Sequence, residues 1–126
     1  MVIREVRPLV AALLKRAANG KRLCSFNELH GLFGEEIDSP DVYDTLEAAS
    51  RDLAPSELAI YSALMAKRGN QLPGLGFFDI FRNLRPDEYD AIAGQNTHPT
   101  RLTEEQRQAM AQFERHRVYM HAEGLP

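Results

Sequence analysis

The residues best suited to binding chemistry form a short basic turn in the middle of the chain, Lys67-Arg68-Gly69-Asn70. Lysine and arginine side chains contact phosphate oxygens, so a turn of this kind can bind a nucleic-acid backbone. Lys21, Arg22 and Arg51 would add positive charge to the same surface if the fold brought them near. The other interpretation, which the composition of the segment favours, is a solvated turn that contacts no partner.

A second candidate site is the segment 72–82, in which a Pro-Gly turn precedes a cluster of phenylalanines. Such a segment can line a small-molecule pocket that has polar groups at its mouth. The pattern is more typical of a turn whose glycines allow positive φ angles, followed by aromatic side chains that fill the core. The candidate pocket residues are Phe77, Phe78, Asp79 and Arg82.

Patterns for metal binding and catalysis are weak. His116 and His121 do not have the i, i+4 spacing that places two zinc-binding histidines on one helical face. Acidic residues gather between positions 79 and 90, but most of them fall in the first turns of a predicted helix, where the helix dipole stabilises them. Phosphate-binding loops and nucleophile elbows do not occur. We therefore expect no metal, no cofactor and no catalytic residue. The acidic residues in question are Asp79, Asp87, Glu88 and Asp90.

Composition is that of an ordinary globular domain. The 126 residues suit one domain, with 44% hydrophobic and 26% charged residues. A formal net charge of -3 gives no overall positive field toward nucleic acid or anionic lipid. No apolar stretch is long enough for a membrane span, and the first residues lack a signal-peptide pattern. We expect a cytoplasmic protein with no membrane partner.

The single cysteine, Cys24, cannot form an internal disulfide, which fits a reducing compartment. It comes just before a predicted helix, a position that can lower the pKa of a thiol. A buried thiol with a packing role is the more usual interpretation.

The first half of the chain predicts three helices. Apolar residues at helical spacing indicate a helix over 5–18, which the Asn-Gly pair at 19–20 ends. Ser25 and Glu28 have the spacing of a capping box, so a short helix should begin at Phe26 and end near Gly34. Ser39-Pro40 should start the third helix, because proline is favoured at the first helical position. The last two helices would form a helix-turn-helix.

The segment 58–67 is ambiguous between helix and strand, and its composition slightly favours helix. A turn-rich stretch follows over 68–76, and then the apolar segment 77–81. Two apolar segments around a glycine-containing connection could form a small β-hairpin, which would be a wing.

The rest of the chain predicts a helical extension. Pro86 should open a short helix that Gly94 ends, and Gln95 to Arg101 should be a loop. Thr103 and Gln106 form a second capping box, which should start a long helix to about Ala122. We therefore expect a single, mainly α domain over 1–126, with a winged-helix-like core over 1–82 and a C-terminal helical extension over 83–126.

The last helix could be a docking face for a partner or for a second copy of the chain, although packing on its own domain is the more usual role. The candidate residues lie near one face of this helix, at Met110, Phe113, Arg117 and Met120.

The segment Gly20-Lys21-Arg22-Leu23-Cys24-Ser25-Phe26-Asn27-Glu28-Leu29 is similar to a Gly-x-x-x-Thr-Tyr-Gly-x-Ile-Ala pattern. Together with the later helix, apolar segment and turn from Gly69 to Gly74, it resembles the winged-helix domain of alkylguanine-DNA alkyltransferases and alkyltransferase-like proteins. The resemblance covers roughly residues 5–82. It implies a winged-helix fold in which 58–67 is a strand.

The sequence departs from this family at two functional places. The reactive Pro-Cys-His-Arg segment would fall near Ile60 to Met65, where no such residues occur, so alkyl transfer is excluded. The helix that matches the recognition helix carries four carboxylates and only Arg51, so it is poorly suited to a phosphate backbone. The four carboxylates are those of Asp41, Asp44, Glu47 and Asp52.

These observations predict a non-catalytic binding module with a regulatory or accessory role. We expect its partner to be a protein rather than DNA. The alternative is a nucleic-acid-binding winged-helix protein that uses a basic wing. A third possibility is a small enzyme with a site around Phe77 to Arg82. Homo-oligomerisation through the C-terminal helix is a further expectation.

Overall fold

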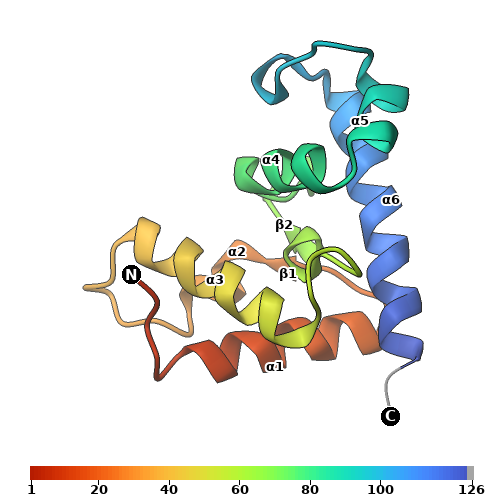
Figure 1. Cartoon of the computed structure of the whole chain (residues 1–126). Coiled ribbons are helices and arrows are strands. Elements are labelled where there is room, and N and C mark those ends of the chain that lie inside the picture. The colour runs from red at the N-terminus through yellow and green to blue at the C-terminus, as the bar shows by residue number, and fades with distance from the viewer. Residues whose placement is uncertain (125–126) are drawn as a thin grey trace.

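A computed structural model describes residues 1–124 and is mainly helical, as the sequence predicts (Figure 1). The elements in chain order are α1 (Arg7–Asn19), β1 (Cys24–Ser25), α2 (Phe26–His30), α3 (Ser39–Leu53), the 3₁₀ helix η1 (Tyr61–Leu64), β2 (Met65–Ala66), α4 (Leu75–Leu84), α5 (Pro86–Ala93), the 3₁₀ helix η2 (Pro99–Arg101) and α6 (Glu104–Glu123).

Helix α6 connects two apolar clusters. Figure 1 shows α1 and α3 side by side, with α6 standing upright beside them and α4 and α5 against its other half. In the first cluster, side chains of α1, α2 and α3 pack with Val118 and Ala122 from the end of α6. In the second, the phenylalanines of α4 and Tyr89 of α5 pack with Met110 from the beginning of α6. The long helix therefore contributes to both halves of the core.

The capping predictions are confirmed. Ser25 Oγ accepts a hydrogen bond from the Glu28 N–H, and the Glu28 carboxylate accepts one from the Ser25 N–H. The same reciprocal pair joins Thr103 and Gln106 at the start of α6. Helix α2 ends earlier than predicted, at His30, and turns continue to Phe33. Leu29 of α2 lies in the same apolar cluster as α3.

The predicted hairpin between 58–67 and 77–81 is wrong. Within residues 1–124 the only sheet is a two-stranded parallel one, in which Cys24 pairs with Met65 and Ser25 with Ala66. The apolar segment 77–81 lies inside helix α4. As part of a helix, Phe77, Phe78 and Phe81 all reach the second cluster. A strand would place Phe78 on the opposite face from Phe77 and Phe81, so that the three rings could not pack in one cluster. Packing here overrides the strand propensity of phenylalanine.

The ambiguous segment 58–67 is neither a regular helix nor a long strand, and it passes through η1 and β2. Its backbone is buried from Ala59 to Ala66, so its polar groups need partners away from water. Arg115 of α6 supplies several of them. Its guanidinium donates hydrogen bonds to the carbonyl oxygens of Ala63 (2.7 Å), Met65 (3.0 Å) and Gln71 (2.7 Å).

The neighbouring Glu114 also binds the backbone of this segment. Its fully buried carboxylate accepts hydrogen bonds from the Ile60 N–H (2.9 Å) and from the guanidinium of Arg85 (2.6 and 3.0 Å). Arg85 also donates to the carbonyl oxygens of Ser56 and Glu57. Two adjacent residues of α6 thus fix the path of the irregular chain from 56 to 71.

No helix within residues 1–124 is both long and apolar enough to cross a bilayer.

Replacing Glu114 with Gln should lower the free energy of unfolding by about 3–5 kcal/mol, because it leaves the buried Arg85 guanidinium without its counter-charge. Urea denaturation at neutral pH measures this change. The exposed Glu105, on the same helix, is the control, and Glu105→Gln should cost at most about 1 kcal/mol through the helix dipole. Equal losses in the two variants would contradict a special role for Glu114.

Candidate functional site

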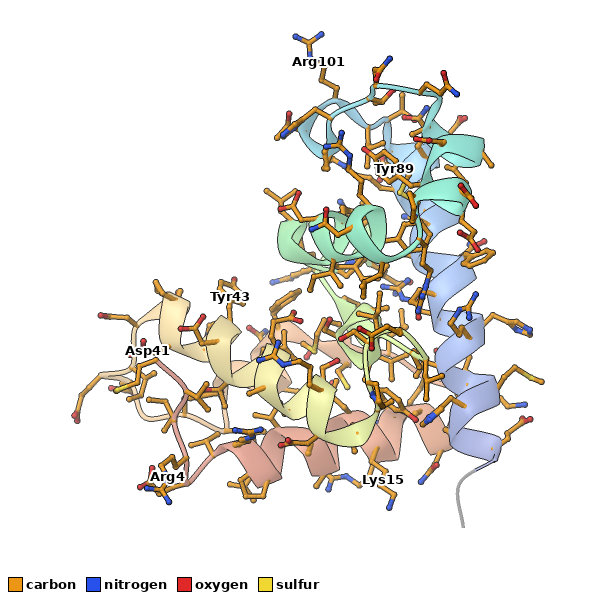
Figure 2. All side chains as sticks on the ribbon, in the orientation of Figure 1. Arg4, Lys15, Asp41, Tyr43, Tyr89 and Arg101 are labelled. Atoms are coloured by element: carbon orange, nitrogen blue, oxygen red, sulfur yellow. The ribbon has the colours of Figure 1, made fainter. Side chains whose placement is uncertain are left out.

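A pocket of about 360 Å³ opens between α2, α3 and the beginning of α4. We call it the Tyr43 pocket. Figure 2 shows Tyr43 projecting from α3 on the side that faces α4. The residues that line it are Phe26, Tyr43, Leu46, Glu47, Ser62, Lys67, Gly74, Leu75, Gly76, Phe77 and Ile80.

The walls of the pocket are mostly apolar, and two helices arrange them. Tyr43, Leu46 and Glu47 have i, i+3 and i+4 spacing, so they share one face of α3. The ring of Phe26 meets that of Tyr43 edge to face, with 6.2 Å between their centroids. Across the pocket, the beginning of α4 contributes Gly76 and Phe77, and Gly74 lies just before this helix.

Ser62 supplies a polar group with no partner. Its side chain is only 3% exposed, and among the described residues its hydroxyl makes no hydrogen bond. The Ser62 N–H is occupied, since it donates to Ser50 Oγ. A buried hydroxyl without a partner costs free energy, so such a group usually serves a bound molecule or an ordered water.

Glu47 is the acidic group of the pocket. Burial raises the pKa of its carboxyl, and the nearby Ser62 hydroxyl and Arg51 guanidinium lower it in part. The Ser62 hydroxyl lies near this carboxylate but outside hydrogen-bond geometry, and it has no other partner within residues 1–124. The sequence places Glu47 among the carboxylates that would repel phosphate. The structure instead turns it toward an apolar pocket.

The basic turn lies at one end of this pocket. Lys67 lines the Tyr43 pocket, and Lys67 and Arg68 also border a smaller depression of about 170 Å³ beside His30. Both side chains are exposed, and within residues 1–124 neither forms an ion pair. The turn itself is closed by a hydrogen bond from the Lys67 N–H to the Leu72 carbonyl, and Gly69 has a φ of 100°.

The other predicted basic residues do not join Lys67 and Arg68 in these depressions. Lys21 forms an ion pair with Glu123 at the end of α6 (2.7 Å), and Arg22 is exposed before β1. Arg51 lies on α3, close enough to Glu47 to lower its pKa. Asn70 has a structural role, because its side chain accepts a hydrogen bond from the Leu72 N–H and its carbonyl accepts one from Gln108.

The structure divides the predicted pocket residues among different surroundings. Phe77 lines the Tyr43 pocket and also belongs to the second cluster, whereas Phe78 is buried in that cluster and lies outside the pocket. Asp79 is exposed, and Arg82 lies over the ring of Tyr89 at 5.6 Å. A helix turns each successive side chain by about 100°, so Phe78 and Asp79 point away from the pocket that Leu75, Gly76 and Phe77 line. Sequence reasoning missed Tyr43, Glu47 and Ser62 because their convergence depends on the packing of α3 against the segment after it.

Three of the four carboxylates on α3 are engaged within the molecule. The amino group of Met1 pairs with Asp41 (2.8 Å) and Asp44, and Arg7 forms a two-point contact with Asp52 (both 2.6 Å). The Arg7 guanidinium holds the pKa of Asp52 below its usual value. These contacts attach α3 to the chain before and within α1. Arg51 is the single basic residue of α3, so the helix has no basic face.

Cys24 is a buried thiol. It is 1% exposed, and burial raises its pKa to about 11. The prediction of a structural cysteine is therefore confirmed, and the alternative of a lowered pKa is wrong, because desolvation of the thiolate outweighs the nearby arginines.

The predicted docking face of α6 is only partly available. Met110 is fully buried, while Phe113 is 39% and Met120 56% exposed. Phe113 packs against Phe81 and under Arg117. Oligomerisation through α6 stays a prediction.

Comparisons with protein-family models, with curated proteins and with solved structures give no match to this chain. Within residues 1–124, no three His, Cys, Asp and Glu side chains gather as a metal site would require.

The raised pKa of Glu47 gives a pH-dependent prediction. A carboxyl whose pKa is higher in the folded than in the unfolded chain stabilises the fold below its unfolded pKa, and that stabilisation is lost as pH rises through the folded pKa. Glu47→Gln removes this titration. The variant should therefore gain stability relative to the wild type between about pH 4 and pH 7. Urea denaturation of both proteins at the two pH values tests this. If the two proteins differ in free energy of unfolding by the same amount at both pH values, the prediction is contradicted.

Proposed function

We propose that this chain is a non-catalytic binding module that receives an apolar side chain of a protein partner in the Tyr43 pocket. The observation that carries the proposal is the pocket itself, a mostly apolar cavity with a buried hydroxyl that has no partner within residues 1–124. Its size lies at the lower end of the range for ligand sites, which suits one anchoring side chain. Tyr43 and Leu75 at the pocket are 44% and 57% exposed, so they offer apolar surface to a partner.

The polar groups of the pocket favour binding over catalysis. A serine nucleophile needs a base hydrogen-bonded to it, and although the Glu47 carboxylate lies near the Ser62 hydroxyl, no hydrogen bond joins the two groups. Asp79, at the centre of the enzyme alternative, is exposed and outside the pocket. The Ser62 hydroxyl and the Glu47 carboxylate are instead well placed to orient a ligand by hydrogen bonds.

A nucleic-acid-binding function is the second candidate. Exposed Lys67 and Arg68 lie beside the rings of Phe26 and Tyr43, and basic and aromatic side chains together suit a nucleic-acid strand. Against this, Lys21 is engaged with Glu123, and α3 carries acidic residues. The winged-helix interpretation of α2 and α3 belongs to this candidate and stays a prediction.

Peptide selection with a matched pair of glycine variants tests the first function. Gly76 lines the pocket, and a Cβ added there meets nothing within 4 Å, so Gly76→Phe should fill the pocket without backbone strain. Gly34→Phe is the control, because Gly34 is equally open and lies outside the pocket. Peptides selected from a random displayed library on the wild type should share a large apolar residue. Their affinity should fall at least tenfold for Gly76→Phe and stay unchanged for Gly34→Phe.

Selected peptides that bind both variants as they bind the wild type would place the binding surface elsewhere and overturn the proposal. Thermal denaturation of both variants shows whether each remains folded.

Salt-dependent DNA binding decides the second candidate. If the protein-binding function holds, fluorescence anisotropy with labelled duplex or single-stranded DNA should show no specific binding at about 50–200 mM salt. The double variant Lys67→Ala, Arg68→Ala should behave as the wild type does. Affinity that falls steeply with salt, and falls further in the double variant, would instead favour the nucleic-acid function.

A further inference from the structure

The depth of each polar group in the Tyr43 pocket shows what kind of ligand it suits. Ser62, at 3% exposed, is the most deeply placed, and Glu47 is partly buried beside it. Lys67 is exposed and lies at the mouth. A carboxylate and a hydroxyl can both accept hydrogen bonds, whereas an ammonium only donates them. The inner end of the pocket therefore suits a ligand donor, and the mouth suits a ligand acceptor.

The charges of the pocket favour a neutral ligand. Glu47 and Lys67 carry opposite charges, and they are the charged residues that line it. A cationic ligand would meet Lys67 at the mouth, and an anionic ligand would meet Glu47 inside. The remaining walls are aromatic and aliphatic, and the rings of Phe26, Tyr43 and Phe77 all contribute.

We infer that the anchor is a tryptophan side chain of the partner, whose ring lies among the aromatic walls and whose indole N–H donates to the Ser62 hydroxyl or the Glu47 carboxylate. This inference rests on the proposed binding function. Tryptophan combines a large apolar surface with a single donor, and it is enriched among the residues that dominate protein interfaces. The carbonyl oxygen of its own peptide group would face Lys67. A second copy of this chain cannot supply the anchor, because the sequence contains no tryptophan.

The absence of tryptophan also makes the test direct, since indole fluorescence comes from the ligand alone. The probe is N-acetyl-tryptophanamide, titrated with the full chain. We expect a blue shift and a Kd of about 0.1–1 mM, which is appropriate for a ligand of this size. The analogue methylated on the indole nitrogen, which lacks the donor, should bind about tenfold more weakly. N-acetyl-phenylalaninamide, whose affinity is measured by competition, should bind about as weakly as the methylated analogue.

Ser62→Ala and Glu47→Leu together remove the two acceptors. In this double variant the preference for the N–H form over the N-methyl form should disappear. Ser62→Ala alone should fold normally, because it removes a hydroxyl that has no partner among the described residues. Gly76→Phe should abolish binding of both ligands, and the control Gly34→Phe should change neither.

The outcomes separate this inference from the function on which it rests. If both indoles bind equally and Gly76→Phe blocks both, the pocket is a binding site but the N–H contact is wrong. If phenethylamine binds more tightly than N-acetyl-tryptophanamide, Glu47 receives a cation, and the neutral anchor is overturned. If neither indole binds while selected peptides still require an open pocket, the tryptophan anchor is wrong and the proposed function stands.

Discussion

Glu114 and Arg115 are adjacent on α6, and both hold one irregular segment through hydrogen bonds to its backbone. Glu114 accepts hydrogen bonds from Ile60 and Arg85, and Arg115 donates to carbonyl groups of η1, β2 and the turn that follows. Both residues are buried. Burying a charge costs free energy unless its partners compensate the lost hydration, which Arg85 does for Glu114 and three carbonyl oxygens do for Arg115. These contacts therefore strongly constrain the path of the segment.

The candidate site depends on that constraint. Ser62 belongs to η1 and Lys67 follows β2, so the segment that α6 holds supplies two of the four polar side chains of the Tyr43 pocket. Helix α3 supplies the other two, Tyr43 and Glu47, and this helix is held in turn by ion pairs with Met1 and Arg7. The pocket thus lies where several independently anchored elements meet. Because other contacts hold these elements in place, the Ser62 hydroxyl can be buried without a partner within the described chain.

Local signals in the sequence predicted the helices well. Capping boxes at Ser25 and Thr103 and the proline at position 86 mark the starts of α2, α6 and α5, because each satisfies or removes unpaired N–H groups of a first turn. The hairpin prediction failed where such signals were missing. The start of α4 has no side-chain cap, and its phenylalanines favour strand as an isolated composition.

The sequence by itself therefore determined the mainly helical class, most helix starts and the buried state of Cys24, since these follow from interactions within a few residues and from hydrophobicity. Only the tertiary structure decided the course of residues 56–74 and the convergence of Tyr43, Glu47 and Ser62. The physical reason is the separation of the groups involved. The Ile60 N–H finds its acceptor on Glu114, 54 residues later, and no local pattern in the chain encodes that contact.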